Sequence, residues 1–427
     1  MTGTGRPGTG LHLPRNAWLL ALTSFLRDVA SEMLVHLVPL FLANVLGART
    51  GLIGLVEGLA ETTASATKIL SGWLSDRLGR RKGLTVAGYG LATAALPLLL
   101  LGSWGAVLAC RVLDRLGKGL RTAPRDALLA DSLPPDRRGL GFGLHRAADS
   151  AGAFAGLLAA LALVAWLQPS RPVLEAGTFR VLVLWALVPA TLSVLVVVLG
   201  VREVPRPALP SPGPGSPAVL GTPFRRFLLA VVLFTLGNSS DAFLILRVQE
   251  AGGTVLEVLG MMAVFNLAYT LLSVPAGHLS DRWGRRRTVL AGWSVYGLVY
   301  LGFALAGARW HYWVLYAFYG AYYALTEGVL KALVADLVPE PEARGLAFGL
   351  YHGAVGLAAL PASLLGGVLW QGVGAWPGFG PRAPFLLGGA LALAAALLLA
   401  LAVPLRAERG PGGPDAERAG PSGQPSP

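Results

Sequence analysis

Acidic side chains lie at regular spacing inside the first apolar stretch of the sequence, where a charge is expensive. Asp28, Glu32 and His36 stand four positions apart in FLRDVASEMLVHLVP, so they follow one side of a helix. Two neighbouring carboxylates in apolar surroundings can themselves take up and release protons. We therefore predict proton coupling at Asp28 and Glu32. One alternative is an ion pair with Arg27 or with a basic residue of the predicted span at 106–130, and capping of a broken helix is a second. A metal site with His36 is another by ligand type, although we expect no resident metal or cofactor.

A denser charged group follows in RVLDRLGKGLRTAPRDALLAD, residues 111–131. On a helix its charged residues share an arc of about 120°: Arg111, Asp114, Arg115, Lys118, Arg121 and Arg125. Four arginines and one lysine against one aspartate leave this arc positive, so it must face protein or water rather than lipid. Any positive charge that acidic residues leave unneutralised could bind an anionic substrate, because arginine presents a planar bidentate fork.

Further polar residues lie in the other apolar stretches. We predict that His36 and the first four residues of this arc, Arg111 to Lys118, line a substrate cavity. Seven further polar residues complete the predicted lining: Glu57, Glu61, Arg146, Asp149, Asp241, Asn266 and Glu327. Structural pairing is the alternative for Arg146 with Asp149 and for Glu327 with Lys331, which stand three or four positions apart. Asp241 in FTLGNSSD aligns with Glu32 in FLRDVASE, and tyrosines of the second half could add an aromatic wall.

The elements that position these residues are predicted from composition. The chain has 427 residues, of which 54% are hydrophobic and only 14% are charged, against about 25% charged residues in soluble domains. Several apolar runs contain no charged residue, and each is long enough to cross a membrane as a helix of about 20 residues. Twelve spans are predicted, at about 17–45, 51–74, 84–103, 106–130, 140–167, 180–201, 224–247, 254–276, 288–307, 311–336, 346–370 and 383–404. The fold class is therefore an all-α membrane protein.

A proline-rich segment, VREVPRPALPSPGPGSPAVLGTP, separates the sixth and seventh spans. Such a segment is an extended linker and not a helix. It predicts a six-helix bundle over residues 1–200, a cytoplasmic linker over 201–223, a second six-helix bundle over 224–405 and a disordered cytoplasmic tail over 406–427. Basic residues concentrate in alternate loops, which predicts that both termini face the cytoplasm across the plasma membrane.

Composition and motifs also exclude function classes. The net charge of +12 is accounted for by these loop arginines, so we expect no nucleic-acid partner. The single cysteine, Cys110, supports neither a disulfide nor a zinc site. None of the short motifs typical of hydrolases, phosphate loops or metalloproteases is present, so we do not expect an enzyme.

Two charged segments occur twice. LSDRLGRR at 74–81 recurs as LSDRWGRR at 279–286, and ADSLPPDRRGLGFGL at 130–144 recurs as ADLVPEPEARGLAFGL at 335–350. Both copies fall at the same place in their half, so the halves are a parallel duplication and should be pseudo-symmetric. Membrane transporters are often built from such repeats, with a substrate site between them.

The longer stretch GWLSDRLGRRK, residues 72–82, resembles the signature of the loop between the second and third spans in the major facilitator superfamily. The resemblance recurs at Gly277–Arg287, where His278 replaces the usual second residue. It implies a transporter that works by alternating access, with Asp76 and Asp281 as conformational latches against a helix of the other half. The other latch residues would be Gly72, Gly79, Arg80, Arg81, Arg285 and Arg286. The alternative is that these basic loops only set topology.

The function we expect is proton-coupled export of small amphipathic compounds by a monomer in the lipid bilayer. The superfamily's antiporters carry a glycine motif in the fifth span; Gly143, Gly152 and Gly156 match its spacing, but Leu157 stands where its proline should be. Proton-coupled symport or exchange of an organic anion or metabolite is therefore an alternative, favoured if basic residues of the fourth span face the cavity unpaired. A non-transporting membrane sensor or scaffold is a remote third possibility.

Overall fold

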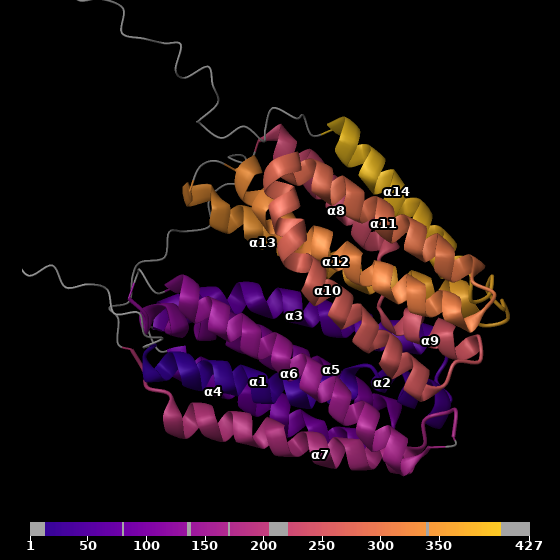
Figure 1. The fold of residues 1–427 in the computed structure, drawn as a ribbon, viewed down its shortest axis with the longest axis horizontal. Helices are drawn as coiled ribbons and strands as arrows, with labels where there is room; N and C mark the ends of the chain where they lie inside the picture. Colours follow the sequence, from indigo (N-terminus) through magenta and orange to yellow (C-terminus); the bar gives the residue numbers. More distant parts are fainter. Residues whose placement is uncertain are drawn as a thin grey trace, which may run out of the picture. The chain divides into compact units, whose positions relative to one another are not determined.

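The structure is a computed structural model. It describes residues 13–78, 81–134, 138–169, 171–204, 221–338 and 341–402. Within these ranges the side chains of residues 69–70, 72–78, 138–140, 143, 281 and 341–346 are not described. The described residues are helices joined by short loops (Figure 1).

Helices of the first half of the chain are α1 (Arg15–Val35), α2 (Val38–Leu40) with a π-turn at Phe41–Val45, α3 (Thr50–Leu78), α4 (Arg81–Ala95) with a 3-10 turn at Leu96–Leu101, α5 (Trp104–Asp131), α6 (Arg138–Leu167) and α7 (Ala176–Leu195) with a π-turn at Val196–Gly200. Those of the second half are α8 (Thr222–Gly237), α9 (Ala242–Glu250), α10 (Val255–Trp283), α11 (Arg285–Leu305), α12 (Arg309–Leu337), α13 (Pro341–Gln371) and α14 (Ala383–Ala402). Because α2 continues α1 and α9 continues α8, twelve segments result, and the predicted all-α fold is confirmed.

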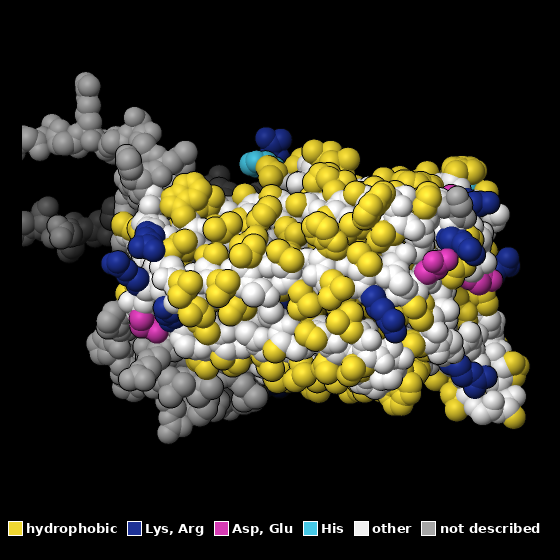
Figure 2. Space-filling view, turned by 90° about the horizontal axis from the view of Figure 1, so that it is seen from below, with side chains coloured by type: hydrophobic (Ala, Val, Ile, Leu, Met, Phe, Trp, Pro, Cys, Tyr) yellow, Lys and Arg dark blue, Asp and Glu magenta, His cyan; other side chains and the backbone are white. Residues whose placement is uncertain are grey.

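Within the part of the chain that the structure describes, nine of the twelve segments are long and apolar enough to cross a membrane. The remaining three are α3, α5 and α12. Charged residues recur along α3 and α5, whereas α12 is rich in the less apolar residues tyrosine, tryptophan and histidine. On the face shown in Figure 2, hydrophobic and uncharged side chains fill the middle, and most charged ones lie toward its two ends. A charge distribution of this kind fits a protein whose middle faces hydrocarbon.

Several helices extend past the predicted spans, because an apolar run marks the membrane core and not the end of a helix. The clearest case is α10, which continues to Trp283 through the charged LSDRW sequence. Gly284 ends it with a positive φ of 90° and directly precedes α11. Glycine tolerates this backbone conformation, which other residues rarely adopt. The second copy of the charged octet, residues 279–286, therefore forms a helix end with a tight turn.

Contacts divide the chain into two compact units, which are described separately. Unit 1 comprises Met1–Phe41, Ala66–Pro169 and Leu174–Ser211. In it α1 packs on α6 and α7, and α4 packs on α5. Gly152 and Gly156 lie against the backbone of α1 at Phe25 and Val29. Because a side chain at either glycine would collide with that backbone, the glycines allow α1 and α6 to approach closely.

Unit 2 comprises Leu42–Ser65, Ser170–Val173 and Pro212–Pro427. In it α12 packs on α10 and α11, and α14 packs on α8 and α11. Its core is aromatic: the rings of Phe234 and Trp293 stack with centroids 4.6 Å apart. The first part of α3 also belongs to this unit, where Thr62 donates a hydrogen bond of 2.6 Å to the Gly356 carbonyl of α13.

The seventh segment is interrupted between α8 and α9, at Asn238–Asp241. An interrupted helix frees backbone carbonyls that must find donors in a membrane. Tyr296 donates to the Gly237 carbonyl at 3.2 Å, and Tyr300 donates to the Ser239 carbonyl at 3.4 Å. The aromatic core of unit 2 thus supplies the polar groups that the interruption requires.

Candidate functional site

A charged pocket lies in unit 1 between α1, α5 and the 3-10 turn after α4. Its volume is about 80 Å³. Five basic and three acidic side chains line it, together with apolar and small polar ones: Arg27, Asp28, Ser31, Glu32, Leu34, Val35, Val38, Leu96, Leu99, Cys110, Arg111, Asp114, Arg115, Lys118 and Arg121. The charged arc predicted on the fourth span therefore faces a cavity from Arg111 to Arg121, as do both predicted proton-coupling carboxylates. Arg125, the last residue of the arc, pairs with Asp126 outside the pocket lining.

The two carboxylates of α1 have different surroundings. Glu32 lies 3.1 Å from Nε2 of His36, one turn further along the same helix. Asp28 is half-buried and makes no hydrogen bond or ion pair with any residue that the structure describes. A carboxylate without a partner can gain or lose a proton without breaking a contact, so Asp28 is the better placed of the two to carry a proton.

An ion pair joins α1 to α5 at the pocket wall. Arg27 is 1% exposed and donates through Nη2 to Oδ1 of Asp114. Its Nε and Nη1 atoms are buried and have no hydrogen-bond partner among the described residues. We considered a pair between Arg27 and an acidic neighbour of α1, but the structure pairs it with Asp114, 87 positions away.

Arg121 lies at the other side of the pocket and is held by an aromatic ring. Its guanidinium carbon stands 4.7 Å from the centroid of Tyr89 on α4. Gly88 and Gly117 let these helices approach, because a Cβ at Gly88 would lie 2.7 Å from the Gly117 carbonyl. Arg121 is 6% exposed, and its Nη1 atom has no hydrogen-bond partner in the described part of the chain.

A second titratable pair of unit 1 lies outside the residues that line the pocket. Nδ1 of His145 stands 3.5 Å from Oδ2 of Asp149, one turn apart on α6. His145 Nε2 and Asp149 Oδ1 are buried without a hydrogen-bond partner among the described residues. Asp149 thus faces His145 and not Arg146, which is exposed. Spacing alone favoured the pair of Arg146 with Asp149, and the histidine was missed.

The predicted cavity residues of the second half lie in an aromatic cluster of unit 2. Asp241 accepts hydrogen bonds from Tyr319 at 2.6 Å and from Tyr323 at 3.4 Å. Glu327 accepts one from Tyr269 of α10, so its partner is a tyrosine and not Lys331, which is exposed. Asn266 bonds to the Met262 carbonyl of its own helix at 3.0 Å. The rings of Phe265 and Tyr323 pack edge to face in the same cluster, with centroids 5.2 Å apart.

The other predicted cavity residues of the first half do not line the pocket. Glu57 is buried and Glu61 is exposed, both on the part of α3 that packs in unit 2. His36 is held by Glu32 beside the pocket. The metal site considered for Asp28, Glu32 and His36 is not formed, since no three acidic, histidine or cysteine residues gather for a metal in the described ranges.

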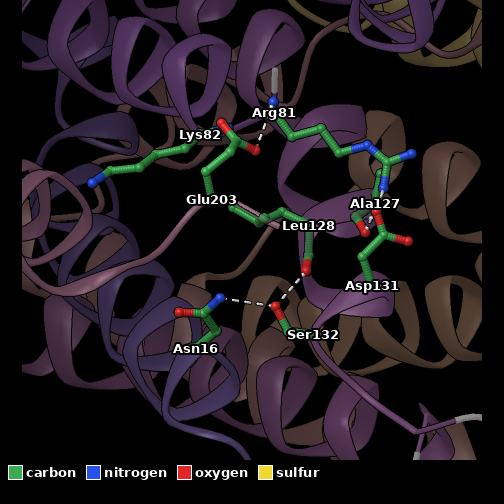
Figure 3. A network of polar contacts seen from close by, with 8 residues as sticks. All are labelled: Asn16, Arg81, Lys82, Ala127, Leu128, Asp131, Ser132 and Glu203. Carbon is green, nitrogen blue, oxygen red and sulfur yellow. Dashed lines mark hydrogen bonds and ion pairs between the residues drawn. The ribbon is translucent and has the colours of Figure 1, made fainter. Parts of the chain in front are cut away.

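Two of the proposed latch residues, Arg81 and Arg285, begin the helices α4 and α11, and Figure 3 shows the contacts of the first. Arg81 donates to the Ala127 carbonyl at 2.9 Å and forms an ion pair with Asp131 of α5. In unit 2, Arg285 donates to the Ala332 carbonyl at 3.0 Å and forms an ion pair with Asp336 of α12. Arg286 donates to the carbonyl of Ala400. Gly79 and Arg80 lie outside the described residues, as do the side chains at Gly72, Asp76 and Asp281.

Figure 3 also shows a residue that the sequence did not suggest. Glu203, at the start of the linker, accepts hydrogen bonds from the backbone amides of Arg81 at 3.0 Å and Lys82 at 2.9 Å. These amides open α4, where a carboxylate is stabilised by the helix dipole. Asn16 of α1 binds the backbone of Arg202 at 2.9 and 3.0 Å beside it. The start of the linker is thereby fixed to unit 1.

Comparison with known proteins decides the family. The family model of the Major Facilitator Superfamily matches residues 20–262 and again residues 227–425. The chain belongs to the Major Facilitator Superfamily. An uncharacterized member of it, an MFS-type transporter from Methanocaldococcus jannaschii, is 38% identical over 398 residues, which is 91% of this chain and 94% of that relative.

Other members of the superfamily are similar over less of the chain or in fold alone. The multidrug resistance protein MdtH of Aeromonas hydrophila is 34% identical over 143 residues, 33% of this chain and 36% of that protein. The crystal structure of the nucleoside transporter NupG matches with a TM-score of 0.75 at 12% identity, over 91% of this chain and 100% of that chain. Together with the family match, these findings identify a multi-pass membrane transporter of small molecules and not an enzyme.

Proposed function

We propose that this protein is a proton-coupled secondary transporter of small amphipathic molecules, with the pocket of unit 1 as its binding site and Asp28 as its proton carrier. One observation carries the proposal: Asp28 faces a pocket lined by basic and apolar side chains and has no hydrogen bond or ion pair among the described residues. Acidic residues within membrane segments mark proton relays when they face a cavity.

The mechanism follows from the charges around Asp28. Asp149 of α6, Lys118 and Arg121 of α5 and Glu32 of α1 all lie near enough to interact with its carboxylate. Protonation of Asp28 removes a negative charge from the pocket and strengthens the positive field of α5. The pocket therefore holds a solute differently in the two protonation states, and that difference in affinity is what couples two transport events. The buried Arg27–Asp114 pair keeps α1 fixed to α5 in both states.

The latches would set which side of the transporter is open. The pairs Arg81–Asp131 and Arg285–Asp336 hold equivalent helix ends in the two halves. Arg81 and Arg285 follow the signature aspartates Asp76 and Asp281 closely in the sequence, and we propose that these aspartates engage and release during alternating access. We place the protein in the plasma membrane as a monomer with both termini in the cytoplasm, in accordance with the basic loops.

A second candidate, proton-driven export of organic cations, is favoured by the aromatic cluster of unit 2. There Asp241 lies against Tyr319 and Tyr323, and aromatic faces beside a carboxylate suit a cationic ligand. A partial relative is named as a multidrug resistance protein. Under this alternative the cation and the proton would exchange, because both are drawn to the same carboxylates.

Proteoliposomes that enclose a pH-sensitive dye test the proposal. Organic cations and organic anions are added to the wild type and to Asp28→Asn, and the initial rate of pH change is recorded. We expect at least a 100-fold loss in Asp28→Asn, since the variant cannot carry a proton. Asp126→Asn is the control, because Asp126 is 42% exposed and paired with Arg125 outside the pocket lining. Proton movement at the wild-type rate in Asp28→Asn would refute the proposal.

A further inference from the structure

We infer that the pocket of unit 1 takes an organic anion, whose head binds the guanidinium edge of Arg121 and whose apolar body lies against the leucine and valine side chains of the same pocket. The ligand class is a small amphipathic carboxylate, or a phosphonate of the same shape. The inference rests on the proposed function in one respect, that this pocket is the transport site. It goes further by fixing the charge of the substrate and the residue that reads it.

The first argument is the state of Arg121. Arg121 is only 6% exposed and lines the pocket. It forms no ion pair or hydrogen bond with any described residue. Asp114 is near enough to interact with Arg121 but is bound directly to Arg27. A buried charge without an ion pair of its own is destabilising, so such a group is retained where a ligand supplies that partner. Tyr89 contacts only the face of the guanidinium, and the N–H groups in its plane stay available for a planar, bidentate acceptor.

The second argument is the charge of the whole pocket. The charged groups that face it from α1 are Arg27, Asp28 and Glu32, and those from α5 are Arg111, Asp114, Arg115, Lys118 and Arg121. Asp114 is already bound to Arg27, and Glu32 already contacts His36. Five basic against three acidic side chains leave the lining positive, which disfavours an organic cation and favours an anion.

The third argument is the shape of the lining. Leu34, Val35 and Val38 of α1 and Leu96 and Leu99 beside α4 form an apolar wall in the same pocket. The volume of about 80 Å³ is several times the roughly 10–15 Å³ that one water requires. The pocket therefore has room for a head group with a short aliphatic body, and inorganic anions would leave the apolar wall unfilled.

The charge of the ligand also fixes the direction of coupling. An anion bound at Arg121 repels the carboxylate of Asp28, so anion and proton bind more tightly together than either does alone. The two would then cross the membrane in the same direction. A cation would instead compete with the proton and be exchanged for it. Anion recognition at Arg121 thus predicts symport.

The test is ligand binding to the purified full-length protein in an uncharged detergent, measured by calorimetry. The probes share one aliphatic chain and differ in the head: pentanoate, pentylphosphonate and pentylammonium. We expect both anions to bind the wild type at least about tenfold more tightly than the cation. The ratio of the dissociation constants of pentanoate and pentylphosphonate shows which head group the pocket prefers. Pentylammonium binding as tightly as the anions would overturn the inference without the need of any variant.

Variants then locate the contact. Arg121→Gln should weaken pentanoate binding by at least about tenfold, and Arg121→Lys should recover part of it because the charge returns without the fork. Arg180→Gln removes the same charge from an exposed position on α7 and should bind as the wild type does. Undiminished binding in Arg121→Gln would overturn the inference. Asp28→Asn separates the two proposals: removing the carboxylate that repels the anion should tighten pentanoate binding, whereas the proposed function predicts only a loss of proton movement for that variant.

Discussion

Unit 1 and unit 2 each carry a half-buried aspartate, and the surroundings of the two carboxylates are opposite. In unit 1, Asp28 faces a pocket of arginine and lysine side chains and has no hydrogen bond among the described residues. In unit 2, Asp241 is held by Tyr319 and Tyr323. Protonation of the first breaks no contact, whereas protonation of the second weakens two hydrogen bonds. Two halves that descend from one duplicated sequence have therefore diverged into a charged, adaptable site and a fixed, aromatic one.

The comparison assigns different tasks to the two halves. The pocket of unit 1 can respond to a ligand and to a proton, because Arg121 and Asp28 line it without a direct partner among the described residues. Tyrosines that donate to a carboxylate and to an interrupted helix hold a scaffold in place, and unit 2 uses them for both. The two halves share an ion pair at a helix end. Arg81 pairs with Asp131 and Arg285 pairs with Asp336, and these two aspartates occupy the same position in the repeated segment.

The largest effect is expected from breaking the buried pair of unit 1. Asp114→Ala leaves the charge of Arg27 buried and unpaired, which costs roughly 3–5 kcal/mol of stability. Tyr319→Phe in unit 2 removes one hydrogen bond and should cost only about 1 kcal/mol. Thermal unfolding of the two purified variants in the same detergent measures the difference. Equal losses would mean that the two units do not differ in the way described.

A smaller effect is expected from the carboxylate of unit 2. Asp241→Asn keeps an acceptor for the tyrosines, so transport should fall by about tenfold, less than the loss expected for Asp28→Asn. The initial rate of solute-driven pH change in proteoliposomes provides the ranking. If Asp241→Asn abolished proton movement while Asp28→Asn did not, the tasks of the two units would have to be exchanged.

His145→Gln tests whether protons leave the pocket along α6. The imidazole faces Asp149 from its own helix, with Arg125 and Asp126 of α5 and Arg146 of α6 as the other charged groups around it. If it passes protons on, the variant should slow proton movement by about fivefold while solute binding stays unchanged. Since glutamine keeps the size and polarity of the side chain, a loss of binding would point to a purely structural histidine.

The smallest effect is expected for Tyr323→Phe. Its hydroxyl lies 3.4 Å from Asp241, a weaker bond than the 2.6 Å bond from Tyr319. Its ring contacts with Phe265 and Tyr269 would remain. We expect transport within about twofold of the wild type. A loss as large as that of Asp241→Asn would show that this hydroxyl, and not the carboxylate, is the functional group of the cluster.

Sequence patterns predicted the fold well because membrane spans are set by local composition. The twelve segments and the charged signatures at their ends follow from apolar runs and repeats, and the basic arc of α5 was recognisable from helical periodicity. Long-range partners were not recognisable. The Arg27–Asp114 pair joins positions 87 apart, and spacing within a helix favours near neighbours. For the same reason Asp149 was assigned to Arg146, although helix packing turns it toward His145.

The tyrosine partners of Asp241 and Glu327 show the same limit. The tyrosines were noted as an aromatic wall, but their hydroxyl groups bind carboxylates on other helices. Glu203 could not be predicted, because a glutamate in a proline-rich segment has no distinctive sequence pattern. Its role depends on the contact between the start of the linker and the first turn of α4. Roles that depend on which helices meet require the three-dimensional structure.

The central claim, that solute and proton meet at Asp28 in unit 1, is tested most directly by counting protons on binding. Calorimetry of solute binding in two buffers of different ionisation enthalpy gives the number of protons taken up or released between about pH 5 and pH 8. For pentanoate we predict uptake of up to about one proton by the wild type, since an anion favours protonation of a nearby carboxylate. Asp28→Asn should bind the same solute with no proton change. The same proton change in that variant would contradict the account.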